Sequence, residues 1–65
     1  MNVGKSIKIA LVKHDKDQKW LAKKLGVVPQ HVSRLATTPT ARSSTIERLA
    51  EIFKMPESEF IALGE

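Results

Sequence analysis

Residues 18–35 read QKWLAKKLGVVPQHVSRL, and their pattern predicts two short helices joined by a tight turn. Apolar residues recur at spacings of three and four on both sides of Gly26, which is the spacing of one helix face. Gly26 can adopt the positive φ that ends a helix at little cost, and Pro29 suits the first turn of a new helix. The segment therefore predicts helices over 18–25 and 29–36, arranged as a helix-turn-helix.

The side chains of this segment fit that arrangement. Ala22 is small where the two helices are expected to cross, and Asp17 can accept a hydrogen bond from the first turn of the first helix. The side chains expected to face inward are Leu21, Leu25, Val27, Val32 and Leu35. A generic pair of antiparallel helices is the alternative that the pattern leaves open.

Three more helices are predicted outside this segment. One covers roughly 4–13, with Ile7, Ala10 and Leu11 on one face. Another follows a loop over 37–43, where Ser44-Thr45-Ile46-Glu47 reads as a capping box. It is expected to bury Ile46, Leu49, Ala50 and Phe53.

The last predicted helix starts near Pro56, carries Phe60, Ile61 and Leu63, and is ended by Gly64. Apolar residues recur at spacings of three and four rather than two, so no strand is expected. The prediction is an all-α protein, one five-helix domain over residues 1–65.

Composition narrows the classes of protein and of partner. The 65 residues include no cysteine, which excludes disulfides and thiolate metal sites. The longest apolar run, residues 9–12, is far short of the ~20 residues of a membrane helix, so we expect a soluble, cytoplasmic protein. The net charge is +4, and seven of the eight lysines lie within 5–24. This distribution favours a polyanion, chiefly nucleic acid, as the partner of the N-terminal half.

Two segments resemble a known family. Residues 18–27 are similar to the second helix and turn of phage Cro and lambda-repressor-like domains (the XRE family), and 46–53 resemble their fourth helix. The similarity extends roughly over 3–63. It implies a compact, Cro-like transcriptional regulator without a separate effector domain. Such a protein binds duplex DNA as a homodimer on a two-fold operator, at the nucleoid of a bacterial or phage-infected host cell. No cofactor, metal, membrane or small-molecule substrate is implied.

The resemblance also implies which residues contact DNA. The start of the second helix matches Gln18, which faces a phosphate, and the loop before the fourth helix matches Thr38, Thr40 and Arg42, which contact the backbone. Lys19 lies beside Gln18 and is expected to contact phosphate as well. The first turns of the recognition helix match Pro29, Gln30, His31, Ser33 and Arg34.

The chemistry of these side chains supports the match. Gln30 can pair with adenine and Arg34 with guanine in the major groove, and their spacing of four places them on one helix face. For His31, a phosphate contact and simple solvation both stay open, and for Ser33 a base contact stays open.

Some positions depart from the family pattern. Val28 stands where the family has a serine or threonine cap, so the recognition helix should start about 1 kcal/mol less favourably. Thr38 replaces a glycine, and Leu11 with Ala36 replaces an ion pair. Trp20 either covers Lys16 or Val12 or contacts a partner. His14 is expected to be a half-buried residue at a helix end.

The sequence gives less support to other functional classes. The sequence has no phosphate-binding glycine loop, no supported pair of nucleophile and base and no metal-ligand spacing, so an enzyme is not expected. The alternative is a protein-binding helix-turn-helix module, such as an antitoxin or a partner of another regulator. Its working surface would include Phe60, Ile61 and Leu63, which together with Met55 are also the candidate dimer surface.

Overall fold

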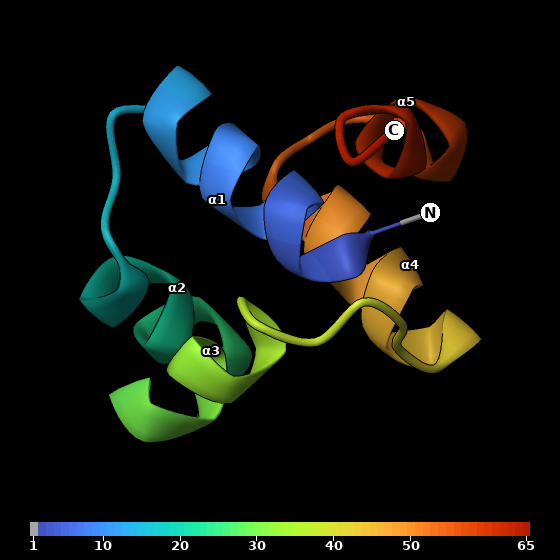
Figure 1. Ribbon diagram of the computed structural model, residues 1–65. Helices are drawn as coiled ribbons and strands as arrows, with labels where there is room; N and C mark the ends of the chain where they lie inside the picture. The colour runs from blue at the N-terminus through green and yellow to red at the C-terminus, as the bar shows by residue number, and fades with distance from the viewer. Residues whose placement is uncertain (1) are drawn as a thin grey trace.

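Each helix of the fold occupies the part of the chain where the apolar spacing predicted one (Figure 1). The computed structural model describes residues 2–65, and within that range it contains helices and no strand. The helices are α1 (Val3–Lys13), α2 (Gln18–Leu25), α3 (Pro29–Leu35), α4 (Ser43–Ile52) and α5 (Glu57–Ala62). The all-α prediction is confirmed. None of these helices is both long enough and apolar enough to cross a bilayer.

The first two helices are capped by side chains. Asn2 Oδ1 accepts a hydrogen bond from Lys5 N at 3.1 Å, and Asp17 Oδ1 accepts one from Trp20 N at 2.9 Å. These bonds satisfy amide groups that have no partner inside the helix. The cap predicted at Asp17 is confirmed, whereas Asn2 had not been identified as a cap.

The turn between α2 and α3 is held by backbone hydrogen bonds. Gly26 has φ +73°, its N–H donates to Lys23 O, and the N–H of Val27 donates to Ala22 O. This pair of bonds is a Schellman motif, which needs a left-handed residue at its centre. The prediction that Gly26 ends the first helix of the pair is therefore confirmed.

The next two helices begin without a side-chain cap. Val28 has an extended backbone before α3 and makes no capping bond, as expected for valine. The capping box predicted at Ser44 is wrong, because α4 begins one residue earlier, at Ser43, with Arg42 in the cap position. Ser44 therefore lies inside the first turn, where it cannot act as the residue that precedes the helix.

Every helix contributes to one apolar core. Phe53 and Phe60 stack at its centre with ring centroids 6.2 Å apart. The buried apolar side chains are Val3, Ile7, Ala10, Leu11, Leu21, Ala22, Val32, Ala36, Ile46, Leu49, Ala50, Phe53 and Phe60.

Three expectations about apolar or terminal residues are corrected. Val27 is 37% exposed, because it follows the turn and lines a groove instead of entering the core. Phe60 is fully buried, and Met55, Ile61 and Leu63 pack against the core, so this set is not a free surface.

Gly64 is the third correction. It does not end α5, which stops at Ala62. A Cβ atom on Gly64 would collide with Asn2 O and Ser6 Oγ, so this glycine allows the C-terminal segment to contact the start of α1. The start of α1 and the C-terminal segment lie side by side as a result (Figure 1).

A close backbone contact also ties the loop after α3 to the start of α1. Val3 N–H donates to Pro39 O at 2.9 Å, and Gly4 N–H donates to Thr38 O at 2.8 Å. A Cβ atom on Gly4 would lie 2.5 Å from Ala36 O, so no larger residue fits without movement. The end of α3 and the loop that follows it are thus positioned by α1.

Candidate nucleic-acid interface

Helix α3 buries one side and exposes the other. Val32 is fully buried and Leu35 partly buried, which anchors the helix to the core. Gln30, Ser33 and Arg34 are exposed, as are Pro29 and His31. All five residues predicted to contact bases are therefore accessible on one short helix.

An open depression of about 340 Å³ lies on this helix, lined by Val28, Gln30, His31 and Arg34, which we call the α3 face. The structure thus brings together the two residues with the strongest base-pairing chemistry, Gln30 and Arg34. Val28 was not identified as a site residue, yet it is 62% exposed beside them. The signal for it in the sequence was a valine in a capping position, where it stabilises nothing. An exposed apolar side chain at this place can contact a thymine methyl group.

Ser33 and Gln18 contact each other. Ser33 Oγ donates a hydrogen bond to Gln18 Oε1 at 2.8 Å, which joins α3 to the first residue of α2. An amide engaged through its oxygen can still donate from its nitrogen to a phosphate. The hydrogen bond from Ser33 therefore orients the side chain of Gln18.

The loop after α3 contains the other predicted backbone contacts. The hydroxyls of Thr37 and Thr38 donate to Arg34 O at 2.9 and 2.8 Å. Thr38 is half-buried, and its hydroxyl caps the end of α3. Thr40 and Arg42 are exposed, as is Lys19 on α2. Of the predicted phosphate contacts, Thr38 is thus the one whose hydroxyl is already used inside the protein.

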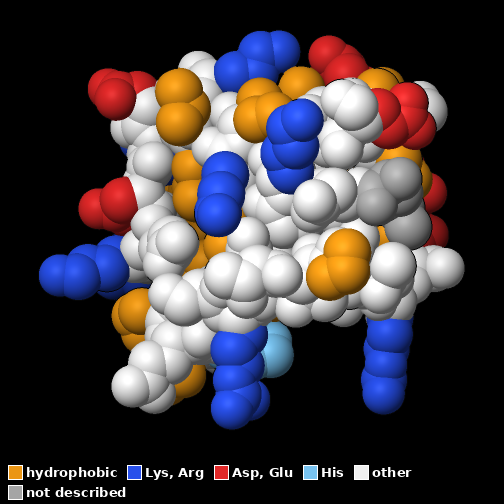
Figure 2. Space-filling model, viewed as in Figure 1, with side chains coloured by type: hydrophobic (Ala, Val, Ile, Leu, Met, Phe, Trp, Pro, Cys, Tyr) orange, Lys and Arg blue, Asp and Glu red, His pale blue; other side chains and the backbone are white. Residues whose placement is uncertain are grey.

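Charge is unevenly distributed over the surface. In Figure 2, Lys and Arg side chains lie over α1 and α2 and project below α3 and the start of α4, whereas acidic side chains lie around α5 and at the edge of the molecule over the connection between α1 and α2. This agrees with the concentration of lysines in the N-terminal half of the sequence. A positive field over α1 to α3 would attract a polyanion to that side.

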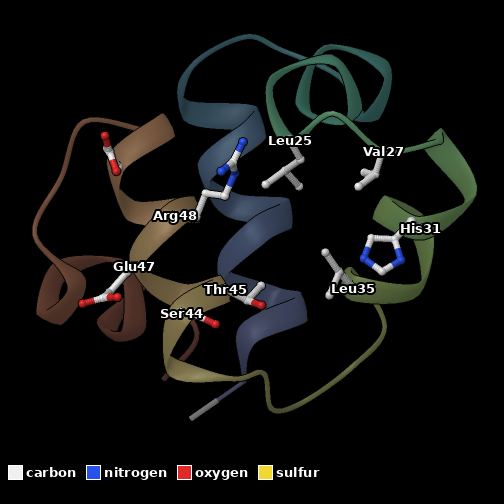
Figure 3. Close-up of a pocket in the computed structure, with 9 residues that line it drawn as sticks. Leu25, Val27, His31, Leu35, Ser44, Thr45, Glu47 and Arg48 are labelled. Carbon is white, nitrogen blue, oxygen red and sulfur yellow. The ribbon is translucent and has the colours of Figure 1, made fainter.

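Two grooves flank α4 on either side of Arg48 and Glu51. The first, of about 550 Å³, separates α3 from α4 (Figure 3). Leu25 and Leu35 point into it, and Thr45 of α4 faces them. Its lining is apolar on one side and polar on the other. Within residues 2–65, no three His, Asp or Glu side chains gather closely enough to hold a metal ion.

The second groove, of about 510 Å³, surrounds Trp20. The indole is half-buried, with its ring centroid 5.9 Å from that of Phe53 and 5.7 Å from Lys16 Nζ. The indole does contact Lys16, as expected, but Lys16 stays exposed and is not covered. Val12 is 79% exposed and is not covered.

His14 is the C-cap residue of α1, and its ring centroid lies 5.4 Å from that of Phe53. Its place at a helix end is confirmed. It is exposed, however, and not half-buried as expected.

Comparison of the chain with family models, curated proteins and solved structures finds no match. The resemblance to Cro-like and lambda-repressor-like domains therefore stays a prediction, and a function for the chain has to be inferred from the geometry described above.

Proposed function

We propose that the protein is a sequence-specific transcriptional regulator of the lambda-repressor-like class, which inserts α3 into the major groove of duplex DNA. The observation that supports this most directly is the α3 face. Gln30, His31 and Arg34 are exposed there, while Val32 on the same helix is fully buried. A helix that is held firmly and presents a polar face is what major-groove recognition requires.

The side chains of the α3 face match the chemistry of base edges. Gln30 pairs with N6 and N7 of adenine, Arg34 takes O6 and N7 of guanine, and Val28 contacts a thymine methyl group. Each well-formed bidentate contact contributes about 1–3 kcal/mol of discrimination against a wrong base. The specificity of the protein is therefore assigned to these three residues.

A second set of residues positions the protein without reading sequence. Gln18 and Lys19 at the start of α2 contact one phosphate group, and Thr40 and Arg42 contact the backbone beyond α3. Such contacts fix register and orientation. The role assigned to Thr38 is indirect, because its hydroxyl caps α3 and shapes the loop that presents its neighbours.

One recognition helix reads too few base pairs for a genomic site, so the active form is a homodimer on a two-fold operator. The two α3 helices then lie ~34 Å apart on one face of the duplex. Because Phe60 is buried, the dimer surface expected at the C-terminal segment is reduced to Met55, Ile61 and Leu63, which are only partly exposed.

The test is to select bound sites from a random duplex pool and then to titrate variants against the selected site and a random duplex. Arg34→Ala should weaken binding to the selected site by about 1–3 kcal/mol and leave random DNA nearly unaffected. Lys19→Ala should weaken both to a similar degree and lower the salt slope by about one unit.

Arg48→Ala is the matched control, since it removes the same side chain from α4, outside the α3 face. It should preserve the ratio of the two affinities. A ratio unchanged by Arg34→Ala would mean that α3 does not read the sequence. A pool from which no site is enriched would contradict sequence-specific binding altogether.

A further inference from the structure

The groove around Trp20 is separate from the α3 face. Its lining comes from the loop between α1 and α2, from α2 and from the end of α4. The α3 face lies on α3 and the residue before it, and the two sets of residues do not overlap. Whatever occupies one of them does not need the residues of the other.

Three lysines make the Trp20 groove positive. Lys16, Lys24 and Lys54 line it, while the charges of Arg48 and Glu51, which also line it, cancel each other. The ammonium groups of Lys16 and Lys24 lie 5.7 and 5.9 Å from the centroid of the indole ring. Both positions are within range of a cation–π interaction, which holds the two like charges beside one ring. Carboxylates placed between the lysines would relieve their mutual repulsion.

The backbone at Lys54 has a conformation that favours glycine. Lys54 has φ +56° and closes α4 with the same two hydrogen bonds that Gly26 makes possible at the end of α2. Glycine adopts this conformation without strain, whereas a residue with a Cβ atom does not. Asp15 closes α1 with the same pair of bonds at φ +53°, so what distinguishes Lys54 is its place on the groove.

We infer that the Trp20 groove binds an acidic segment of a partner protein, rich in glutamate or aspartate and carrying an apolar side chain. The lysines bind the carboxylates, and the apolar side chain packs on Trp20 and the half-buried Ile52. Duplex DNA is a poorer fit, because its bases are stacked inside the double helix and present no apolar side chain to Trp20 and Ile52. The inference does not depend on DNA binding by α3.

The chain offers a direct reporter, because Trp20 is its only tryptophan. The probe is a short glutamate-rich peptide with one phenylalanine, titrated into the whole chain at low salt while Trp20 emission is recorded. The reference is the same peptide with every glutamate replaced by glutamine. We expect a saturable change in emission with the glutamate peptide and none with the glutamine peptide.

Variants then locate the site. Lys16→Gln with Lys24→Gln should weaken peptide binding about tenfold, since each exposed charge pair contributes a few-fold. Lys13→Gln with Lys23→Gln removes the same charge from exposed positions that do not line the groove, and should change the affinity less than twofold, by roughly the loss of screened long-range attraction.

Lys54→Gly separates binding from stability. It should raise the melting temperature by a few degrees, on the order of 5 °C, because the left-handed strain is relieved, and should weaken peptide binding. A lysine with only a structural role at the end of α4 would not produce this opposite pair of effects.

Three results would overturn the inference. The first is an unchanged emission with the glutamate peptide, and the second is equal loss of affinity in the two double variants. The third is that random duplex DNA changes the emission, and that Lys16→Gln with Lys24→Gln weakens DNA binding but not peptide binding. That last result would assign the groove to the DNA backbone.

Discussion

Replacing Gly4 with alanine tests how the loop after α3 is held. Gly4 lies in the first turn of α1, and its N–H donates to Thr38 O at 2.8 Å. An alanine Cβ would lie 2.5 Å from Ala36 O, 2.7 Å from Ala36 C and 3.0 Å from Thr38 O. All three atoms belong to the backbone, so no side-chain rotation can relieve the contact. Either α1 or the end of α3 must move.

The expected cost follows from these contacts. Overpacking of a tight interior site costs typically 1–3 kcal/mol, and weakening the hydrogen bonds from Val3 and Gly4 to the loop adds about 1 kcal/mol. Because alanine forms helices better than glycine, it offsets at most about 1 kcal/mol of this loss in stability. The net loss is about 2 kcal/mol, and a domain of this size has a free energy of unfolding of only roughly 3–10 kcal/mol.

The assay is urea unfolding followed by circular dichroism, with Gly26→Ala as the control. Gly26 has φ +73°, and a Cβ atom added to it would meet nothing within 4 Å, so the same substitution there costs only backbone strain, about 1 kcal/mol. Gly4→Ala should therefore lower the midpoint more than Gly26→Ala, with the slope of the transition unchanged. It should also weaken DNA binding, because the displaced loop carries Thr40 and Arg42.

A neutral or stabilising Gly4→Ala would refute this reasoning. It would mean that helix propensity outweighs the contact with Ala36, and that the loop after α3 is not docked on α1 in solution.

Three further predictions concern buried charge, helix caps and salt. Leu11→Arg should destabilise the protein by about 3–5 kcal/mol, because Leu11 is buried, and adding Ala36→Glu should recover part of the loss; a harmless Leu11→Arg in chemical denaturation would place Leu11 outside the core. Asp17→Ala should lower the free energy of unfolding by about 1 kcal/mol, because it removes the hydrogen bond from Trp20 N, and a thermal melt would show this. Val28→Ser should raise the free energy of unfolding by about 1 kcal/mol, and in a site selection it should reduce the preference for thymine. The logarithm of DNA affinity should fall with the logarithm of salt concentration by about 0.9 for each phosphate neutralised, and a slope near zero would contradict DNA binding.

Local chemistry explains why so much of the fold was predictable. The structure confirms the predicted bounds of α2, its cap at Asp17 and its end at Gly26. Each of these features depends only on residues within about one helical turn of it. The inward positions of Ala22 and Val32 follow from helical spacing in the same way. The cap at Asn2 was readable by the same rule and was missed.

The errors concern residues whose surroundings come from distant parts of the chain. Gly64 looks like a helix terminator in sequence, yet it is needed for the contact with Asn2 and Ser6 at the opposite end of the chain. Phe60 looks like a candidate surface residue until Phe53 is seen stacked against it. Ser44 is the exception, because its error is local: its side chain suits a cap, but α4 begins one residue before it.

The candidate site also contains features set by local sequence and features set by distant residues. The sequence alone identified Gln30 and Arg34 as a pair on one helix face, because a spacing of four is fixed by helix geometry. Only the tertiary structure joined Ser33 to Gln18, whereas the position of Val28 beside Gln30 and the bond from the Thr38 hydroxyl to Arg34 O are local features that the sequence analysis missed.

The lysines around Trp20 show most clearly the difference between local and long-range determinants. The sequence determined that they exist and that the N-terminal half is basic. Lys16 and Lys24 lie four residues before and after Trp20, so their place beside the ring follows from local spacing, whereas Lys54 lines the same groove only because the end of α4 packs against α2. Short-range patterns are set by backbone geometry and are visible in sequence, whereas long-range neighbours are chosen by the packing of the whole core, which no local pattern encodes.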